Sequence, residues 1–474
     1  MLRRIRPGWA AATTLGGACA ALALWWLGGT SETAPAAEPG APNVLVVMTD
    51  DQDSASMRVM RQTRQLIGAR GTTFANSFAT TPLCCPSRAT FFTGQYAHNH
   101  GVRANKPGYA ALDTSETVPV WLDRDGYRTA HVGKFLNRYG RDTDPREVPP
   151  GWDEWYASVD PSTYSMYGYT LNENGQLVNY GSAPRDYQTD VYADKAVDFV
   201  ERSAGDQPFF LSVGTLAPHK DSGNPPRPAP RHAGAFANAP LPRPPSFNEK
   251  HVRDKPAFIR NRPRLGSARV DALTKLHRGR LRSLLAVDDL VKRVIDALRA
   301  TGELANTLVI FTSDNGFLLG QHRLTGKNWV YESSVRVPLL IRGPGVPPGA
   351  TRRQLVGNVD LAATILDATG ATAPASHPLD GVSLLPLALN PNARRGRQLL
   401  LESYVVPYTA LRTSRYLFVR HRSGERELYD MRADPDQQRS LHAQRSYNRV
   451  ESDLAARLRQ LEDCAGRGCA AGSR

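Results

Sequence analysis

The chain is organised around residues 81–94, which read TPLCCPSRATFFTG. Pro86 suits the first turn of a helix, where a missing backbone N–H costs nothing. Cys84 would then lie at the helix N-terminus, where free N–H groups and the positive end of the helix dipole favour an anion. Arg88 adds a planar cation that is suited to binding an oxyanion. The alternative for Cys84 is a buried apolar side chain, the common fate of a free cysteine.

Strands that alternate with helices surround this stretch and predict an α/β fold. Buried-strand patterns occur at 43–49, 128–132, 208–213 and 307–312, and amphipathic helices are expected at about 55–69 and 280–300. This alternation indicates a large, mostly parallel sheet flanked by helices. Ligands of such sheets bind beyond the carboxyl ends of the strands. The candidate site residues are therefore those that follow these strands: Asp50, Asp51, Lys134, His219, Asp314 and Asn315.

The composition indicates a protein with a positive net charge, and both ends of the sequence indicate export from the cell. The 474 residues include 59 Lys and Arg against 45 Asp and Glu, a formal charge of +14 that suits an anionic ligand. No nucleic-acid-binding motif accompanies this charge, so we expect no nucleic acid partner. Arginines at positions 3, 4 and 6 precede an apolar run at about 9–27, which is typical of a secretory signal peptide, or of a membrane anchor if it stays uncleaved. The close spacing of Cys464 and Cys469 fits a small disulfide loop.

The chain is expected to have three parts. These are a signal peptide at 1–36, a main domain at 42–390 and a small C-terminal α+β subdomain at 391–474. In the last part, strand patterns at 397–401, 416–420 and 427–430 precede a helix at about 447–461, which predicts a small antiparallel sheet with a terminal helix. A long segment at 220–265, rich in Pro, Arg and His, is expected either at the rim of the site or as a solvated insertion.

Four of the candidate residues offer only oxygen donors. Asp50, Asp51, Asp314 and Asn315 include no histidine or thiolate, which suits a hard cation such as calcium or magnesium and argues against zinc. An Asp-Asp pair after a strand is more often a turn or a helix cap. Uncompensated carboxylates beside an anion site would repel the anion, however, so the pattern favours a bound divalent cation.

The stretch that begins at Cys84 resembles the signature of the arylsulfatase-type sulfatases, C-x-P-S-R followed by T-G. Segments 331–339, 380–384, 427–431 and 434–435 are also similar to sulfatase sequences, so the resemblance spans about residues 42–464. In that family a formylglycine-generating enzyme oxidises the first cysteine of the signature to formylglycine. The resemblance implies an alkaline-phosphatase-like fold and a sulfuric ester hydrolase with its catalytic domain at 42–390.

The resemblance also implies a role for each residue at the strand ends. The expected metal ligands are Asp50, Asp51, Asp314, Asn315 and the oxygen derived from Cys84, with calcium the expected ion and magnesium the alternative. The residues that match sulfate-binding positions are Arg88, Lys134, His219 and Lys327. One hydroxyl of hydrated formylglycine attacks sulfur, with Asp314 as the candidate base, and His219 or Lys327 protonates the departing alcohol. The second hydroxyl then loses its proton, and sulfate leaves.

One position departs from the family pattern. Many sulfatases have a histidine two residues after the lysine that matches Lys134, whereas this chain has Leu136, so the base for the last step stays open. Residues 133–137 (GKFLN), the second cysteine Cys85 and residues 254–256 (DKP) resemble the N-acetylglucosamine-6-sulfatase and heparan-endosulfatase branch. This branch implies a sulfated sugar as substrate, with 6-O-sulfated N-acetylglucosamine the best guess. The basic residues of the long segment would attract such an anion: Arg227, Arg231, Arg243, Lys250, Arg253, Lys255 and Arg260.

Two other functions are compatible with the same residues. A phosphonate or phosphate-ester hydrolase could use the same signature, and a sulfated-glycan-binding protein could keep Cys84 unconverted. The intact set of oxygen donors favours an enzyme, because a binding protein would not need all four together.

Overall fold

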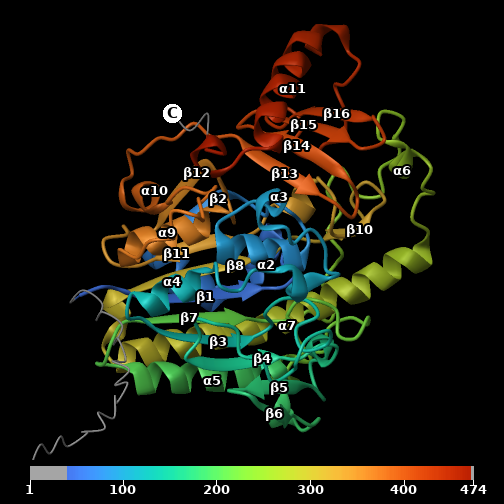
Figure 1. Ribbon diagram of the computed structural model, residues 1–474. Coiled ribbons are helices and arrows are strands. Elements are labelled where there is room, and N and C mark those ends of the chain that lie inside the picture. The colour runs from blue at the N-terminus through green and yellow to red at the C-terminus, as the bar shows by residue number, and fades with distance from the viewer. Residues whose placement is uncertain (1–39, 471–474) are drawn as a thin grey trace, which may run out of the picture. The chain divides into compact units, whose positions relative to one another are not determined.

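The computed structural model describes residues 40–470, and the predicted signal peptide at 1–36 lies outside the described residues. A ten-stranded sheet runs through the middle of the protein in the order β12-β2-β11-β8-β1-β7-β3-β4-β5-β6 (Figure 1). Its strands are β1 (Asn43–Thr49), β2 (Thr72–Phe78), β3 (Arg128–Gly133), β4 (Glu154–Ser158), β5 (Thr170–Glu173), β6 (Gln176–Asn179), β7 (Phe209–Gly214), β8 (Thr307–Ser313), β11 (Leu339–Arg342) and β12 (Ala350–Gly357).

The centre of this sheet is parallel. Strands β8, β1, β7, β3 and β4 pair with one another in parallel, whereas β11 and β5 run antiparallel to their neighbours. The observed topology is therefore the large mixed, mostly parallel sheet that the sequence predicts. All seven residues of β1 are buried because both faces of the strand are covered.

Helices cover both faces of the sheet. Val44 and Val46 of β1 pack with α2, α4 and α9 on one face, while Leu45 and Val47 pack with α5 and α7 on the other. The helices are α1 (Arg61–Leu66), α2 (Cys84–Thr93), α3 (Ala97–His100), α4 (Val118–Arg124), α5 (Gln188–Ser203), α6 (Ala257–Arg260), α7 (Ser267–Ala300), α8 (Glu332–Val335), α9 (Asp360–Thr369), α10 (Leu385–Leu389) and α11 (Asn448–Glu462). Within residues 40–470, none of these helices is both long enough and apolar enough to cross a membrane.

A small antiparallel sheet follows the main sheet, as the sequence predicts. Its strands are β13 (Leu399–Ser403), β14 (Tyr408–Arg412), β15 (Tyr416–His421) and β16 (Arg426–Asp430), and α11 packs against them (Figure 1). Strand β14 is not among the predicted strands. A separate two-stranded hairpin, β9 (Leu318–Leu319) and β10 (Thr325–Gly326), leads from β8 toward α8.

Two helices differ from their predicted bounds because of tertiary contacts. Helix α7 begins at Ser267 rather than near 280, since Leu273 and Leu276 in its first turns are buried against the long segment and β9. The predicted helix at 55–69 is broken into two 3-10 turns and the short helix α1. Near the start of α1, the Asp288 carboxylate accepts hydrogen bonds from the backbone N–H groups of Gln62 and Thr63 at 2.9 and 2.7 Å.

Candidate active site

The N-terminus of α2 places Cys84 in the interior of the protein. The residue before it, Leu83, is extended, and α2 begins at Cys84, so that Pro86 falls in the first turn as the sequence predicts. All ten residues of α2 are buried. In the first turn, the Cys85 N–H donates to Asn105 Oδ1 at 3.1 Å, the Ser87 N–H donates to the Leu83 carbonyl at 3.0 Å, and Pro86 has no N–H. The helix therefore favours an anion here through the positive end of its dipole rather than through a set of free N–H groups.

Strands β1 and β8 bring three carboxylates to Cys84. The strands pair in parallel with Thr49 opposite Ser313, so the next residues, Asp50 and Asp314, leave the sheet side by side. Asp51 has a left-handed backbone with φ of 69°, which aspartate tolerates better than most residues. Oxygens of the three carboxylates and the Cys84 sulfur lie within 4.8 Å of one another.

Three cations face these carboxylates. Lys134, directly after β3, pairs with Asp50. Arg88 donates from Nε to Asp314 at 2.8 Å and from Nη1 to the Lys134 carbonyl at 2.6 Å, while its buried Nη2 has no hydrogen-bond partner among the described residues. Lys327, directly after β10, lies 2.5 Å from an Asp51 oxygen and 2.6 Å from the Cys84 sulfur. The three buried carboxylates are thus balanced by three cationic side chains.

His219 lies beside this group, beyond the end of β7. Its Nε2 is 3.7 Å from an Asp51 oxygen, and its Nδ1 is 2.8 Å from the Lys220 carbonyl. Because a carbonyl only accepts hydrogen bonds, Nδ1 carries a proton. The side chains of His219 and Lys327 are 19% and 14% exposed, whereas that of Lys134 is 1% exposed. Solvent therefore reaches the group from the side of His219 and Lys327.

The charges perturb the pKa values of the carboxyl groups in opposite directions. Burial alone would raise the pKa of Asp50, but the surrounding cations, Lys134 foremost, hold it well below its ordinary value. Burial likewise opposes the lowering of the Asp51 pKa by Lys327. The pKa of Asp314 is instead raised, by burial and by the adjacent Asp50 carboxylate. Asp314 is therefore the most readily protonated of the three.

The thiol and the two bases that face it are also shifted. Burial and the Asp50 carboxylate raise the pKa of Cys84 well above its ordinary value, so it is a neutral thiol at physiological pH. Burial lowers the pKa of His219, which leaves the imidazole neutral. Burial would lower the pKa of Lys327 too, but Asp51 and its other anionic neighbours raise it, so its ammonium group stays charged.

The residues at the strand ends fit a hard cation. The side chain of Asn315 donates to Asp51 at 2.7 Å, while its Oδ1 atom is buried and has no hydrogen-bond partner in the part of the chain that the structure describes. A buried amide oxygen that lacks a donor costs free energy unless something else satisfies it. With three carboxylates close by, this oxygen completes a donor set of the kind that calcium and magnesium take.

Two further residues of this site were not predicted from the sequence. Arg280 of α7 donates to the Asp51 carbonyl and lies 3.6 Å from Asp53, so it holds the turn that carries Asp51. Arg280 could have been noticed in the sequence because it is a charged residue four positions before Leu284, on the apolar face of the helix. The Tyr164 ring lies beside that of His219 in a tilted arrangement, with centroids 5.3 Å apart, and is 5.0 Å from the Lys134 ammonium. No sequence pattern marks Tyr164.

Leu136, at the position where many sulfatases have histidine, belongs to the buried hydrophobic cluster on the α2 side of the sheet and is 2% exposed. The next residue, Asn137, donates from Nδ2 to the Tyr164 hydroxyl, and its buried Oδ1 accepts no hydrogen bond from any described residue. Asn137 rather than Leu136 is therefore the polar neighbour of this part of the site.

The long segment at 220–265 packs against the β9–β10 hairpin that leads to Lys327, since Phe247 bridges to Gln321. Four of its basic residues are neutralised by ion pairs: Arg227 with Asp221, Arg231 with Asp190 and Asp289, Lys255 with Asp254 and Glu249, and Arg260 with Glu425. Arg243, Lys250 and Arg253 are exposed and take part in no ion pair among the described residues. Only part of the segment's charge therefore faces an incoming anion.

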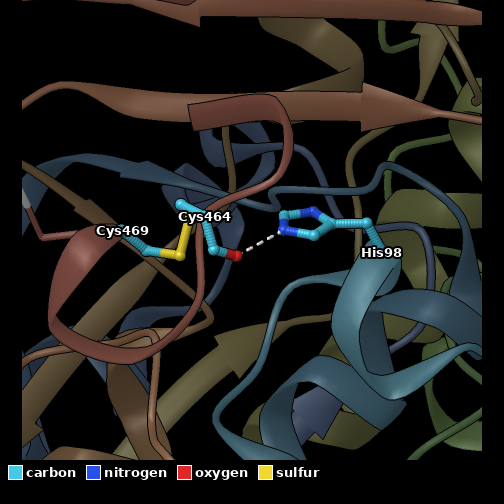
Figure 2. A group of neighbouring side chains, drawn as sticks. All are labelled: His98, Cys464 and Cys469. Carbon is cyan, nitrogen blue, oxygen red and sulfur yellow. Dashed lines mark hydrogen bonds between the residues drawn. A yellow bond between two sulfur atoms is a disulfide. The ribbon is translucent and has the colours of Figure 1, made fainter. Parts of the chain in front are cut away.

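A second group of potential ligands has a structural role. His98, Cys464 and Cys469 lie close together, but the two sulfurs form the predicted disulfide, with an S–S distance of 2.02 Å (Figure 2). His98 donates from Nε2 to the Cys464 carbonyl at 2.9 Å, and its Nδ1 lies 3.2 Å from Glu402. This arrangement anchors the C-terminal disulfide loop to α3.

Comparison with known proteins identifies the family. A model of the sulfatase family matches residues 42–371, and a model described as N-sulphoglucosamine sulphohydrolase, C-terminal, matches residues 320–464. This chain belongs to the sulfatase family, as its signature predicts.

Curated relatives agree with the predicted branch. The chain is 40% identical to the human (Homo sapiens) N-acetylglucosamine-6-sulfatase over 73% of its own length and 64% of the human protein. It is 36% identical to an extracellular sulfatase SULF-1 homolog of Drosophila melanogaster over 74% of its length and 32% of that protein. An arylsulfatase of Volvox carteri is 34% identical over 94% of this chain and 78% of that protein. The chain thus spans from about a third to about two thirds of the length of these two animal relatives.

Solved structures confirm the alkaline-phosphatase-like fold class. A protein solved in complex with its substrate D-glucosamine-2-N,6-O-disulfate is 25% identical, with a TM-score of 0.75 over 88% of this chain and 97% of that chain. The phosphonate monoester hydrolase of Agrobacterium radiobacter is 20% identical, with a TM-score of 0.70 over 89% of this chain and 95% of that chain. The second likeness concerns the fold alone.

Proposed function

We propose that this protein hydrolyses sulfate esters through a formylglycine made from Cys84. The observation that carries the proposal is the position of this residue, buried at the N-terminus of α2 and facing both carboxylates and cations. Carboxylates suit a divalent cation, and the cationic side chains suit the oxygens of a sulfate ester. Membership of the sulfatase family supports the same reaction.

The unmodified thiol of Cys84 would be a poor nucleophile. Its raised pKa keeps it protonated, and the thiolate is the reactive form of cysteine. Formylglycine, as its hydrate, would supply an oxygen nucleophile and a second hydroxyl group that permits release of sulfate. A formylglycine-generating enzyme is therefore a proposed partner, and Cys84, the first cysteine of the signature, is the proposed site of conversion.

We propose that the cation is calcium, with magnesium as the alternative. The residues that would hold it are Asp50, Asp51, Asp314, Asn315 and the group derived from Cys84. The cation would supply positive charge beside the nucleophile and the ester oxygens. The ammonium groups of Lys134 and Lys327 pair with two of these carboxylates, Asp50 and Asp51.

The remaining side chains of the site are proposed to bind the ester or to transfer protons. Arg88, whose Nη2 has no hydrogen-bond partner among the described residues, and the buried Lys134 are the proposed ligands of the ester oxygens. Lys327 is charged and His219 is neutral with its proton on Nδ1, the nitrogen that faces Lys220. Lys327 is thus the better placed of the two to donate a proton to the departing alcohol. Asp314, whose pKa is raised, is the proposed proton acceptor.

The proposed substrate class is a sulfated sugar, with 6-O-sulfated N-acetylglucosamine the first choice. Two relatives support it by name, an N-acetylglucosamine-6-sulfatase and a protein that binds a glucosamine 2-N,6-O-disulfate. Exposed Lys250 lines a cavity of about 530 Å³ together with Arg264 and Arg439, close to the hairpin that leads to Lys327. The two acidic residues of the same lining, Glu249 and Asp254, both pair with Lys255. These cations would attract the rest of an anionic chain. Export from the cell is proposed as well, in keeping with the extracellular relatives.

The test compares sulfate and phosphate esters of one chromogenic alcohol, assayed with converted protein and calcium. We expect sulfate hydrolysis that disappears in Cys84→Ala. A clear preference for the phosphate or phosphonate ester would assign the site to a phosphonate or phosphate-ester hydrolase. Binding of sulfated glycan without turnover, in protein shown by peptide mass spectrometry to contain formylglycine, would assign it to a binding protein.

A further inference from the structure

A second concave site lies at the edge of the large sheet and shares no residue with the Cys84 site. It is a cavity of about 550 Å³ between the first half of β12, the end strand of the sheet, and residues 391–397, which lead into β13. Figure 1 shows β12 next to β2 at this end of the sheet. We call it the arginine cavity.

Arginine dominates its lining. Five of the eleven lining residues are arginines and none is acidic; the arginines are Arg352, Arg353, Arg394, Arg395 and Arg397. Among the described residues, the ion pair between Arg397 and the buried Asp360 is the only one that any of the five makes. Four arginines that make no ion pair with any described residue therefore gather around one cavity whose lining has no carboxylate, although the buried Asp360 also attracts Arg395. A bound anion would reduce the repulsion among them.

The most buried of the four unpaired arginines has an unsatisfied donor. Arg352 is 7% exposed; its Nε donates to the Leu387 carbonyl at 2.6 Å, but its buried Nη2 has no hydrogen-bond partner within residues 40–470. Arg395 donates to the Ser383 carbonyl at 2.9 Å, and burial lowers the pKa of its guanidinium despite the attraction of Asp360. Arg352 is buried without an ion pair among the described residues, and the attraction of Asp360 does not offset the effect of burial on Arg395, so a bound oxyanion would stabilise both guanidinium groups.

We propose that the arginine cavity binds sulfate groups of a sulfated oligosaccharide and so forms a second anchor for an anionic chain. Guanidinium groups bind tetrahedral oxyanions through two parallel hydrogen bonds, and the cavity is of a size that takes a saccharide unit as well as its sulfate. Its lining contains no aromatic side chain. Single-stranded nucleic acid usually stacks its bases on aromatic rings, so the lining favours a sulfated glycan.

The choice of sulfate over phosphate rests on the proposed function, while the anion site itself rests on the arginines. A second anchor would raise the effective concentration of a long substrate at Cys84 without touching the reacting groups. It would therefore lower the KM for a long sulfated chain and leave the turnover of a small aryl sulfate unchanged.

The test uses the full-length protein and two matched double variants. Arg353→Ala/Arg394→Ala removes two exposed arginines of the cavity, and Arg70→Ala/Arg449→Ala removes two exposed arginines elsewhere. Affinity is measured by calorimetry for a heparin-derived octasaccharide, its desulfated counterpart, inorganic phosphate and a single-stranded DNA oligonucleotide. We expect about tenfold weaker binding of the sulfated octasaccharide in the cavity variant, from two exposed charge contacts, and less than a twofold change in the control.

The outcomes separate this inference from the proposed function. Equal binding by the two double variants, or equal binding of the sulfated and desulfated octasaccharides, would overturn it. The inference would also be overturned if the cavity variant lost affinity for DNA alone, or for inorganic phosphate alone, and kept its affinity for the sulfated octasaccharide. Because all four substituted arginines lie outside the Cys84 site, the aryl sulfatase rate should be the same in every variant. An absence of sulfatase activity combined with the expected loss of octasaccharide binding would refute the proposed function alone. Arg353→Glu, a single exposed change, repeats the test if the double variant is unstable.

Discussion

Replacement of Asp50 by asparagine tests the electrostatics of the site most directly. Asp50 is fully buried and pairs with Lys134, and it lies 3.8 Å from Lys327 and 4.0 Å from Arg88. The amide keeps the size of the side chain but removes its charge, so three buried cations would face two carboxylates. Removal of one partner from a buried ion pair typically costs about 3–5 kcal/mol. We expect the free energy of unfolding of Asp50→Asn to fall by about this amount.

The pH dependence of this loss follows from the pKa of Asp50. Burial alone would raise that pKa, but Lys134 and the other cations hold it well below its ordinary value. A carboxyl group with a lowered folded-state pKa stabilises the fold above its unfolded-state pKa of about 3.9. This contribution disappears as the pH falls through the lower, folded-state pKa. The difference between the wild type and the variant should therefore be constant at neutral pH and shrink only below about pH 4.

Calcium should increase the difference in unfolding free energy between the wild type and Asp50→Asn. An ion that binds the folded protein alone, at a hundred times its dissociation constant, adds about 2.7 kcal/mol to stability. We expect this gain in the wild type and little of it in Asp50→Asn, with unfolding followed in guanidinium chloride with calcium or with a chelator. Asp271→Asn, an exposed change, is the control and should behave as the wild type. An equal unfolding free energy for Asp50→Asn and the wild type, or an equal gain from calcium, would refute the reasoning.

Three further outcomes can be measured. Lys327→Met should lower kcat by about 10²–10³ for a sugar sulfate and much less for an aryl sulfate, whose leaving group needs no proton; equal losses for both substrates would exclude Lys327 as the proton donor. Peptide mass spectrometry of active protein should find the aldehyde at Cys84 and an intact thiol at Cys85, and full activity with an unmodified Cys84 would contradict the proposed mechanism. The His98 pKa is raised by Glu402 against the opposing effect of burial, so the stabilisation by this pair is complete below about pH 6.5 and is lost as the pH rises through the folded-state pKa. His98→Gln should remove this dependence from the melting temperature, and an unchanged pH profile would show that the pair contributes nothing.

Local chemistry explains why much of the site could be predicted from the sequence. Asp50, Lys134 and Asp314 each follow a buried strand, and neighbouring parallel strands end at the same edge of a sheet, so their proximity follows once the strands are identified. Pro86 marks the first turn of α2 because its ring is compatible with that position. The C-terminal disulfide follows from the close spacing of Cys464 and Cys469.

Other features depended on partners that are distant in sequence. Arg280 reads locally as part of an amphipathic helix, and only the packing of α7 against the sheet brings it to the Asp51 carbonyl 229 positions away. Tyr164 has no periodic pattern, and its place beside His219 and Lys134 follows from the course of an irregular segment. The arginine cavity is lined by residues of β12 and by a segment about forty positions later, so no local sequence pattern predicts it.

The sequence by itself thus determined the strand–helix alternation, the helix start at Cys84 and the chemical types of the groups at the strand ends, because these depend on short-range hydrophobic periodicity and backbone preference. Only the tertiary structure decided which charges are compensated. Arg231 and Arg353 are indistinguishable as sequence letters, but one contacts Asp190 and Asp289 and the other lines a cavity without a carboxylate. Coulomb energy depends on distance in space and on burial, and neither can be obtained from position along the chain.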